Sequence, residues 1–418
     1  MERIIEMRTL EHQPAVTAMG IGRRPDAGPP DKGFRQRKAR LGVRLAFLVA
    51  GFGMACWAPL VPVARERLSI DEGVLGLLLL CLGLGSVGAM ACVGVLCTRF
   101  GTRRLIVLSG LGMAAILPLL SLAPTPIGLG VALAFFGACL GSLDVAMNIN
   151  ALEVERLAGR PMMSGFHALY SLGGFAGAGF MTALLSLEVA PWVATLLGAG
   201  LMCCSMLLAS RCLSETTRSG HGPVFVAPRG IVLLIAALAA ITFLVEGAMV
   251  DWSALLSIQT DLTNPEQAGI GFVLFSVAMT LGRLVGDTIV LRLGDRLTVR
   301  FGGSITFAGF AILLALPGHA IALLGFVLIG LGASNIVPVL FRRAGKQQAM
   351  PAALAVSAVT TAGYAGVLLG PALIGFAAQM ASLAAAFWLL AVLMLFVAVA
   401  AKAVTPSESL DRPGASGE

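Results

Sequence analysis

The chain has 418 residues, of which 57% are hydrophobic and only 12% are charged, and its mean hydropathy is +0.91. Soluble globular proteins carry about 25% charged residues, so this composition excludes a soluble globule and favours a bundle of membrane-spanning helices. The formal net charge of +7 raises the question of a nucleic-acid partner, which the distribution of the basic residues decides below.

Residues 1–43 are polar and basic and contain no apolar segment of the kind that a secretory signal needs. We predict a disordered cytoplasmic tail for this segment. Its basic cluster leaves two interpretations open. It sets the topology of the first helix, or it also contacts anionic lipid headgroups.

The remaining chain alternates between long apolar segments and short polar ones. A spanning helix needs about 20 mostly apolar residues, and twelve segments meet that requirement. The predicted fold class is therefore an all-α membrane protein. The predicted spans are 44–64, 73–97, 105–123, 127–150, 162–186, 190–210, 231–257, 268–291, 301–317, 320–341, 351–378 and 381–401.

A polar segment at 211–230, RCLSETTRSGHGPVFVAPRG, divides the first six spans from the last six. It predicts an N-terminal bundle over 44–210, a cytoplasmic linker over 211–230, a C-terminal bundle over 231–402 and a cytoplasmic tail over 403–418. Lys and Arg concentrate on the side of the N-terminal tail, and the loops of the other side contain only Arg65 and Arg67. The positive-inside rule then predicts a multi-pass protein of the bacterial inner membrane with both termini in the cytoplasm. Since the positive charge follows topology, no nucleic-acid partner is expected.

The two halves resemble each other at a steady offset of about 190 residues. Two pseudo-symmetric six-helix bundles are typical of transporters with a substrate site between the halves. The matching positions are Trp57 with Trp252, Arg99 with Arg292, Gly141–Asp144 with Gly332–Asn335, and Phe175 with Tyr364.

The eight cysteines lie mostly in apolar segments and form no CxxC pattern, which predicts free thiols rather than a metal site or a disulfide framework. No cofactor is expected, apart from a proton as a candidate coupling ion. We expect a monomer that contacts membrane lipids and a small-molecule solute.

The segment GVLCTRFGTRRLI, residues 94–106, resembles the best-known signature of the major facilitator superfamily. The resemblance implies that this loop helps to lock and release a cytoplasmic gate. Thr98 stands where the family has an acidic residue. The matching residues, which are the candidate gating residues of the first half, are Gly94, Arg99, Gly101, Arg103 and Arg104.

Residues 142–178 and GRLVGD at 282–287 look like the MosC-like and YbjJ-like branch of that superfamily. The name-giving member of this branch is associated with rhizopine, an inositol-derived amine. The resemblance therefore implies a small polar substrate.

Asp144 and Asn148 lie inside an apolar helix, in the stretch SLDVAMNINALEVE. A carboxylate in hydrocarbon costs roughly 3 kcal/mol or more, so its presence needs a reason. Gly137, Gly141, Asp144 and Asn148 share one helix face. We predict a polar cluster there, which serves as a substrate or proton site facing a central cavity, or else forms hydrogen bonds between helices. Its members are Asp144, Asn148, His167, Tyr170 and Ser171.

The second half supplies further candidates. Glu246 lies near the middle of its helix, and Asp251 and Trp252 lie further outward. Trp57 and Trp252 are expected either to stack on a sugar-like ring or to anchor the helices at the membrane–water interface. Asn335 mirrors Asp144. Arg283 and Asp287 are four residues apart and are predicted to pair along the helix as a structural or gating ion pair.

The predicted function is a secondary active transporter, not an enzyme. The chain contains no P-loop, H-E-x-x-H or nucleophile-elbow motif. The favoured activity is alternating-access symport of a sugar, polyol or inositol derivative such as a rhizopine-like compound. The alternative is export of a drug or metabolite. Asp144 and Glu246 are the candidates for proton coupling, or their charge binds a cationic solute.

Overall fold

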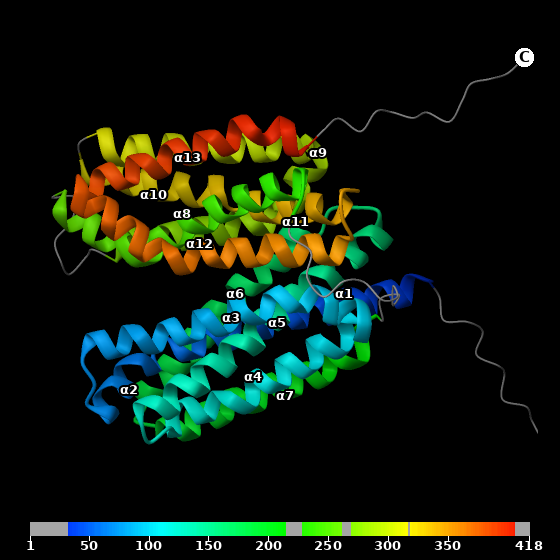
Figure 1. Ribbon diagram of the computed structural model, residues 1–418, viewed down its shortest axis with the longest axis vertical. Helices are drawn as coiled ribbons and strands as arrows, with labels where there is room; N and C mark the ends of the chain where they lie inside the picture. Colours follow the sequence, from blue (N-terminus) through cyan, green and yellow to red (C-terminus); the bar gives the residue numbers. More distant parts are fainter. Residues whose placement is uncertain (1–31, 215–227, 261–268, 317, 406–418) are drawn as a thin grey trace, which may run out of the picture.

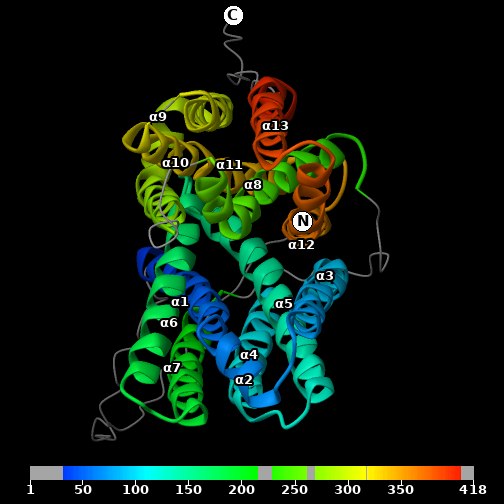
Figure 2. The ribbon, with the colours of Figure 1, turned by 90° about the vertical axis from the view of Figure 1, so that its left-hand side faces the viewer.

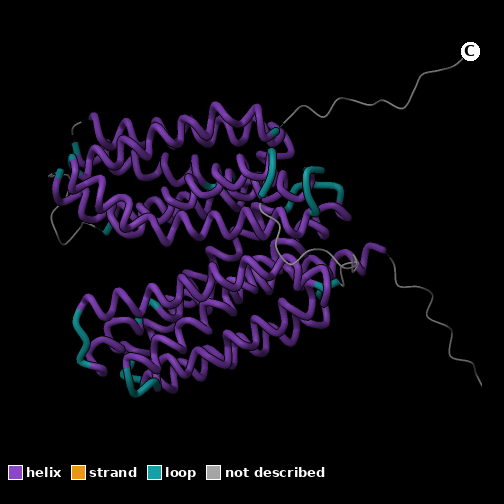
Figure 3. Tube along the Cα trace, viewed as in Figure 1, coloured by secondary structure: helices purple, strands orange, loops and turns teal. Residues whose placement is uncertain are grey.

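The computed structural model describes residues 32–214, 228–260, 269–316 and 318–405. These residues are nearly all helical, and no strand occurs among them (Figure 3). The helices are α1 (Lys32–Trp57), α2 (Leu60–Leu68), α3 (Glu72–Phe100), α4 (Thr102–Leu122), α5 (Pro126–Ala158), α6 (Met163–Ser186), α7 (Pro191–Cys212), α8 (Ile231–Gln259), α9 (Ile270–Ala315), α10 (His319–Ala333), α11 (Ile336–Lys346), α12 (Ala352–Met380) and α13 (Leu383–Val404).

Within the described residues, eleven helical segments are long and apolar enough to cross a membrane, which confirms the predicted all-α membrane class. The predicted number was twelve. The difference lies in α9, which contains both predicted spans 268–291 and 301–317. Gly294 interrupts this helix with φ 76° and ψ 167°, a conformation that glycine adopts without steric cost. The two predicted spans therefore lie on either side of one sharp bend.

The first helix also differs from its prediction. It begins at Lys32 rather than at residue 44, so residues 32–43 are helical, while residues 1–31 of the predicted tail lie outside the described part. Lys, Arg, Gln and Ala are good helix formers, and they extend the apolar helix that follows. The Gln36 side-chain amide fixes this extension by donating to the Leu157 carbonyl at 3.1 Å.

Two predicted spans contain breaks. The first span, 44–64, is divided into α1 and α2 around Pro59. The span 320–341 is divided into α10 and α11 at Ser334 and Asn335. This second break places Asn335 between two helices, rather than inside one as the repeat with Asp144 had predicted.

The helices form two layers, α1–α7 and α8–α13 (Figures 1 and 2). Across the boundary, α3 packs against α12 and α6 against α9. The layers lie closest at the end where α1 begins and α13 ends, and they diverge toward the end that carries α2 (Figure 1). Most of the predicted linker, 215–227, lies outside the described residues.

Small residues allow the close packing that positions α5. A Cβ added to Gly141 would lie 2.6 Å from the carbonyl oxygen of Ser86, and Gly137 meets the backbone of Leu82 just as closely. Such contacts are typical of membrane helix pairs. They hold α5 against α3 at Gly137 and Gly141, and Asp144 follows Gly141 by about one helical turn.

Candidate functional site

Asp144 of α5 is 6% exposed and begins a chain of polar contacts. The Asn148 amide nitrogen donates to the Asp144 carbonyl at 2.9 Å and reaches its carboxylate at 3.5 Å. The Asn148 amide oxygen lies 3.2 Å from His167 Nε2 of α6. Because an amide oxygen only accepts, Nε2 carries the hydrogen of this bond.

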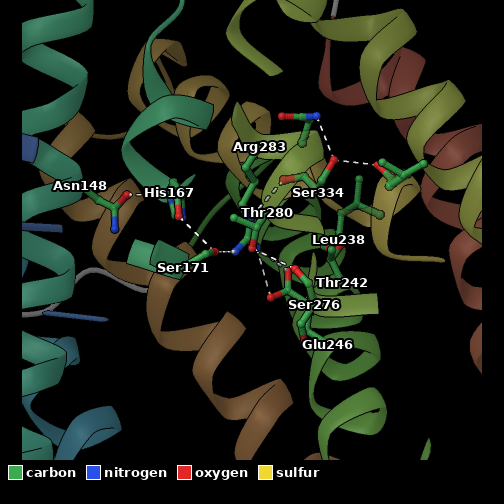
Figure 4. Close-up of polar contacts among 12 residues, drawn as sticks. Asn148, His167, Ser171, Leu238, Thr242, Glu246, Ser276, Thr280, Arg283 and Ser334 are labelled. Atoms are coloured by element: carbon green, nitrogen blue, oxygen red, sulfur yellow. Dashed lines mark hydrogen bonds and ion pairs between the residues drawn. The ribbon is translucent and has the colours of Figure 1, made fainter. Parts of the chain in front are cut away.

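The chain of contacts then crosses to the second half (Figure 4). Ser171 donates to the His167 carbonyl at 3.3 Å, and Arg283 of α9 donates from Nη1 to the Ser171 hydroxyl at 3.1 Å. Arg283 also donates to both carboxylate oxygens of Glu246 on α8, at 3.1 and 3.3 Å, and to the Ser334 carbonyl at 3.3 Å. One buried guanidinium therefore joins both halves.

Two tyrosines complete the cluster. The side chains of Tyr170 on α6 and Tyr364 on α12 are hydrogen-bonded to each other. Both lie close enough to Asp144 and Glu246 for an electrostatic interaction with these carboxylates. Tyr364 was not among the predicted site residues. The repeat comparison had aligned it with Phe175, and its polar hydroxyl was the signal that could have identified it. The cluster thus draws on α5, α6, α8, α9 and α12.

The charges of this cluster do not balance. Among the ion pairs of the described residues, Glu246 is paired with Arg283, and none includes Asp144. A buried carboxylate without a cation is costly, because its hydration is lost without a compensating charge. Asp144 therefore has the environment of a group that binds a proton or a cationic group.

Three predicted site residues lie outside this chain of contacts, and a fourth, Asn335, touches it only through Ser334. Asp251 is exposed on α8, while Trp57 is 3% exposed in the apolar core at the end of α1. Trp252 is half-buried with its ring beside Gly375. Asn335 is 6% exposed and donates to the Gly282 carbonyl at 3.0 Å and to the Ser334 hydroxyl at 2.9 Å.

The predicted pairing of Arg283 with Asp287 is wrong. Arg283 bonds to Glu246, and the Asp287 carboxylate instead accepts from the backbone N–H groups of Ser164 and Gly165, each at 3.0 Å. These amides belong to the first turn of α6, where N–H groups have no partner within the helix and the helix dipole favours a negative charge. Asp287 therefore caps a helix of the opposite half.

A second contact between the halves lies at the same end of α6. Arg342 of α11 forms ion pairs with Glu155 of α5 and with Asp295, the latter at 2.7 Å, directly after the bend in α9. The Glu155 carboxylate also accepts from the backbone N–H groups of Met162 and Met163, at 2.7 and 3.0 Å. Arg342 was not among the predicted site residues. Glu155 closes the same stretch that contains Asp144, but spacing did not indicate its partner.

Glu155, Asp295 and Arg342 line a cavity of about 1010 Å³ between the two halves. Residues of the polar chain, from Asp144 to Glu246, do not contribute to its lining. These ion pairs thus lie apart from the polar chain, nearer to the end where the two halves converge. We call the three residues the charged latch.

The candidate gating residues of the first half have mainly local roles in this structure. Gly101 joins α3 to α4 with φ 86°, and Arg103 donates to the Ser210 carbonyl at 2.9 Å. Arg99 is exposed and lies 5.5 Å from the centre of the Phe100 ring, and Arg104 is exposed. The contact with the second half comes from Gly94, where an added Cβ would lie 2.9 Å from the Ala353 carbonyl of α12.

Two helical halves that enclose a buried polar cluster, with a charged contact at one end, define a membrane transport fold. The family model of the Major Facilitator Superfamily matches residues 44–349 and 237–418. The chain belongs to this superfamily, which confirms the resemblance drawn from its loop signature, and it is a multi-pass membrane protein.

Relatives and solved structures agree with this assignment. The chain is 50% identical over 368 residues to an uncharacterized MFS-type transporter of Yersinia pestis, covering 88% of this chain and 96% of the relative. It is 29% identical over 359 residues to the membrane protein MosC of Rhizobium meliloti, covering 86% and 88%. The fold matches FucP, the fucose:proton symporter of E. coli, in its outward conformation, with a TM-score of 0.73 at 16% identity, covering 88% of this chain and 98% of FucP.

Proposed function

We propose that this protein is a secondary active transporter that moves a small polar solute, a sugar, polyol or inositol derivative, in symport with a proton. It works as a monomer in the bacterial inner membrane, with both termini in the cytoplasm. The observation that carries the proposal is the buried carboxylate of Asp144, which has no ion pair in the described residues and lies beside Tyr364 of the opposite half.

The groups around Asp144 suit a hydroxyl-rich solute. Tyrosine hydroxyls, the Asn148 amide and the Glu246 carboxylate offer both donors and acceptors. Residues of both halves contribute, so a solute bound here has different contacts whenever the halves move relative to each other. Differential affinity of this kind is what biases a transporter between its two states.

The polar chain that begins at Asp144 and the charged latch have separate roles in this proposal. Protonation of Asp144 removes the uncompensated charge of the cluster and precedes solute binding. The charged latch of Glu155, Asp295 and Arg342 holds the cytoplasmic end closed while the site is open to the outside. The likeness to FucP in its outward conformation supports this assignment of the state.

The test is solute uptake by purified protein in proteoliposomes, with and without an inward proton gradient. A panel of sugars, polyols, inositols and inositol amines is compared with hydrophobic cations. Gradient-driven uptake of a hydroxyl-rich solute is the expected result. Transport of hydrophobic cations alone, or uptake of polar solutes at the same rate with and without the proton gradient, contradicts the proposal.

A further inference from the structure

The helical extension before the first span has two distinct faces. Ala39 and Val43 are buried, and a Cβ added to Gly42 would lie 2.7 Å from the backbone nitrogen of Leu213 at the end of α7. With the Gln36 bond to the Leu157 carbonyl, these contacts fix one face of the extension against the first half. The opposite face is therefore held in a constant orientation.

That opposite face is basic. Arg37, Arg40 and Arg44 follow one another at helical spacings of three and four residues, so they form one stripe. Arg160, from the segment between α5 and α6, lies close enough to Arg40 to act on its charge, as do Arg37 and Arg44. We call these four residues the arginine face.

The arginine face lacks counter-charges in the described part of the chain. The ion pairs at this end of the molecule use Arg156, Arg342 and Arg343, and none uses a member of the arginine face. The Nε atom of Arg40 is buried and has no hydrogen-bond partner. A buried donor left without an acceptor is unfavourable, and four neighbouring cations repel one another. A bound anion would accept from the Arg40 donor and reduce the repulsion among the four arginines.

The position of the arginine face at the start of the first span indicates which kind of anion it binds. No charged residue occurs between Arg44 and Arg65, so the apolar part of the first span begins directly after Arg44. Leu41 lies in the same stripe, between Arg40 and Arg44, and is 43% exposed. An exposed apolar side chain among arginines, at the boundary of a spanning helix, matches a ligand with a phosphate and an acyl chain.

We propose that the arginine face binds the phosphate of an anionic phospholipid such as phosphatidylglycerol. Guanidinium groups bind phosphate through paired N–H donors, and Arg40 and Arg160 approach it from two different elements. Leu41 contacts the lipid beside its headgroup. The site lies apart from the polar chain that begins at Asp144, and this inference does not depend on the proposed transport function.

The test measures binding of fluorescent phosphatidylglycerol to the purified full-length chain in detergent, with phosphatidylcholine as the neutral comparison. Arg40→Gln combined with Arg160→Gln is expected to weaken binding on the order of thirtyfold, as for the loss of two arginines near a membrane surface. The matched control is Arg292→Gln combined with Arg300→Gln, two exposed arginines of α9, which should bind as the wild type does.

Three results would overturn the proposal. They are equal binding by the two double variants, equal binding of phosphatidylcholine, and displacement of the lipid by inorganic phosphate at the same concentration. The last result would mean that the face takes free phosphate. If the double variant elutes as an aggregate, Arg44→Gln alone replaces it, with about a fivefold loss expected.

Discussion

Arg283 and Glu246 form a buried ion pair with 3.1 Å between Nη2 and Oε1, and the same guanidinium donates to Ser171 of the opposite half. The side chains are 8% and 18% exposed, so water screens this pair weakly. The pair neutralises the Glu246 charge, and the bond from Arg283 to Ser171 links α9 to α6 of the opposite half. A change at either residue should therefore alter both stability and the movement of the halves.

We expect Glu246→Gln to destabilise the protein more than the double variant that also carries Arg283→Gln. Removing one partner of a buried pair leaves an uncompensated charge and costs about 3–5 kcal/mol, whereas removing both leaves none. Thermal unfolding of the purified variants in detergent gives the comparison. A double variant as unstable as the sum of the two single variants would show that the residues act independently.

A second prediction concerns Asp144. Asp144→Asn should abolish uptake driven by an inward proton gradient but retain solute exchange across the membrane, because the amide keeps the size of the side chain but carries no titrating proton. Uptake and exchange are measured in the same proteoliposomes over a range of pH. Wild-type uptake should rise as the external pH falls, and uptake by the variant should not change with pH.

The control for this substitution is Asp251→Asn, which alters an exposed carboxylate of α8 outside the polar chain. It should leave both uptake and its pH dependence as they are in the wild type. If Asp144→Asn retains the full response to the gradient, a different group couples the proton.

The helices were predictable because each one is encoded locally. A long apolar segment must satisfy its backbone hydrogen bonds internally in a membrane, so hydropathy alone indicates the spans. Hydropathy also placed an interruption between residues 291 and 301, where Gly294 bends α9. The break at Asn335 was missed, because the predicted span 320–341 runs across it. The extension from Lys32 was missed because basic residues look like a tail when their docking surface is unknown.

The candidate site was partly predictable for the same reason. Asn148 and His167 lie on consecutive helices, and both were predicted members of the polar cluster around Asp144. Their contact at 3.2 Å agrees with that prediction. The predicted pairing of Arg283 with Asp287 was wrong because an acceptor four residues along the same helix competes with acceptors from other helices, here Glu246 of α8. Contacts between distant segments, such as Glu155 with Arg342, leave no signal in local spacing.

The charged latch leads to a third prediction. Arg342→Gln removes the ion pairs with Glu155 and Asp295 but leaves the caps that Glu155 provides to α6. The end at which the two halves converge should then open more often, and the α5 and α11 segments around the latch should exchange amide hydrogens faster. Hydrogen–deuterium exchange of the purified protein, followed by peptide mass spectrometry, measures this. Unchanged exchange in the residue 149–161 region would exclude a latch role.

A fourth prediction tests the close packing between the two halves. Gly94 of α3 meets α12, where an added Cβ would lie 2.9 Å from the Ala353 carbonyl and from the Ser357 Cβ, whereas Gly88 of the same helix has nothing within 4 Å. Gly94→Ala should therefore push α3 away from α12, with a cost of about 1–3 kcal/mol in the state that is closed at this end.

Gly88→Ala provides the matched comparison, because it makes the same chemical change on the same helix in open space. It should leave transport and thermal stability close to the wild type. Gly94→Ala should slow uptake and increase cysteine labelling at Cys97, which is 3% exposed one turn further along α3. Equal labelling of Cys97 in the two variants would mean that α3 and α12 do not close against each other during transport, and that the gate relies on the charged latch and the Asp287 cap alone.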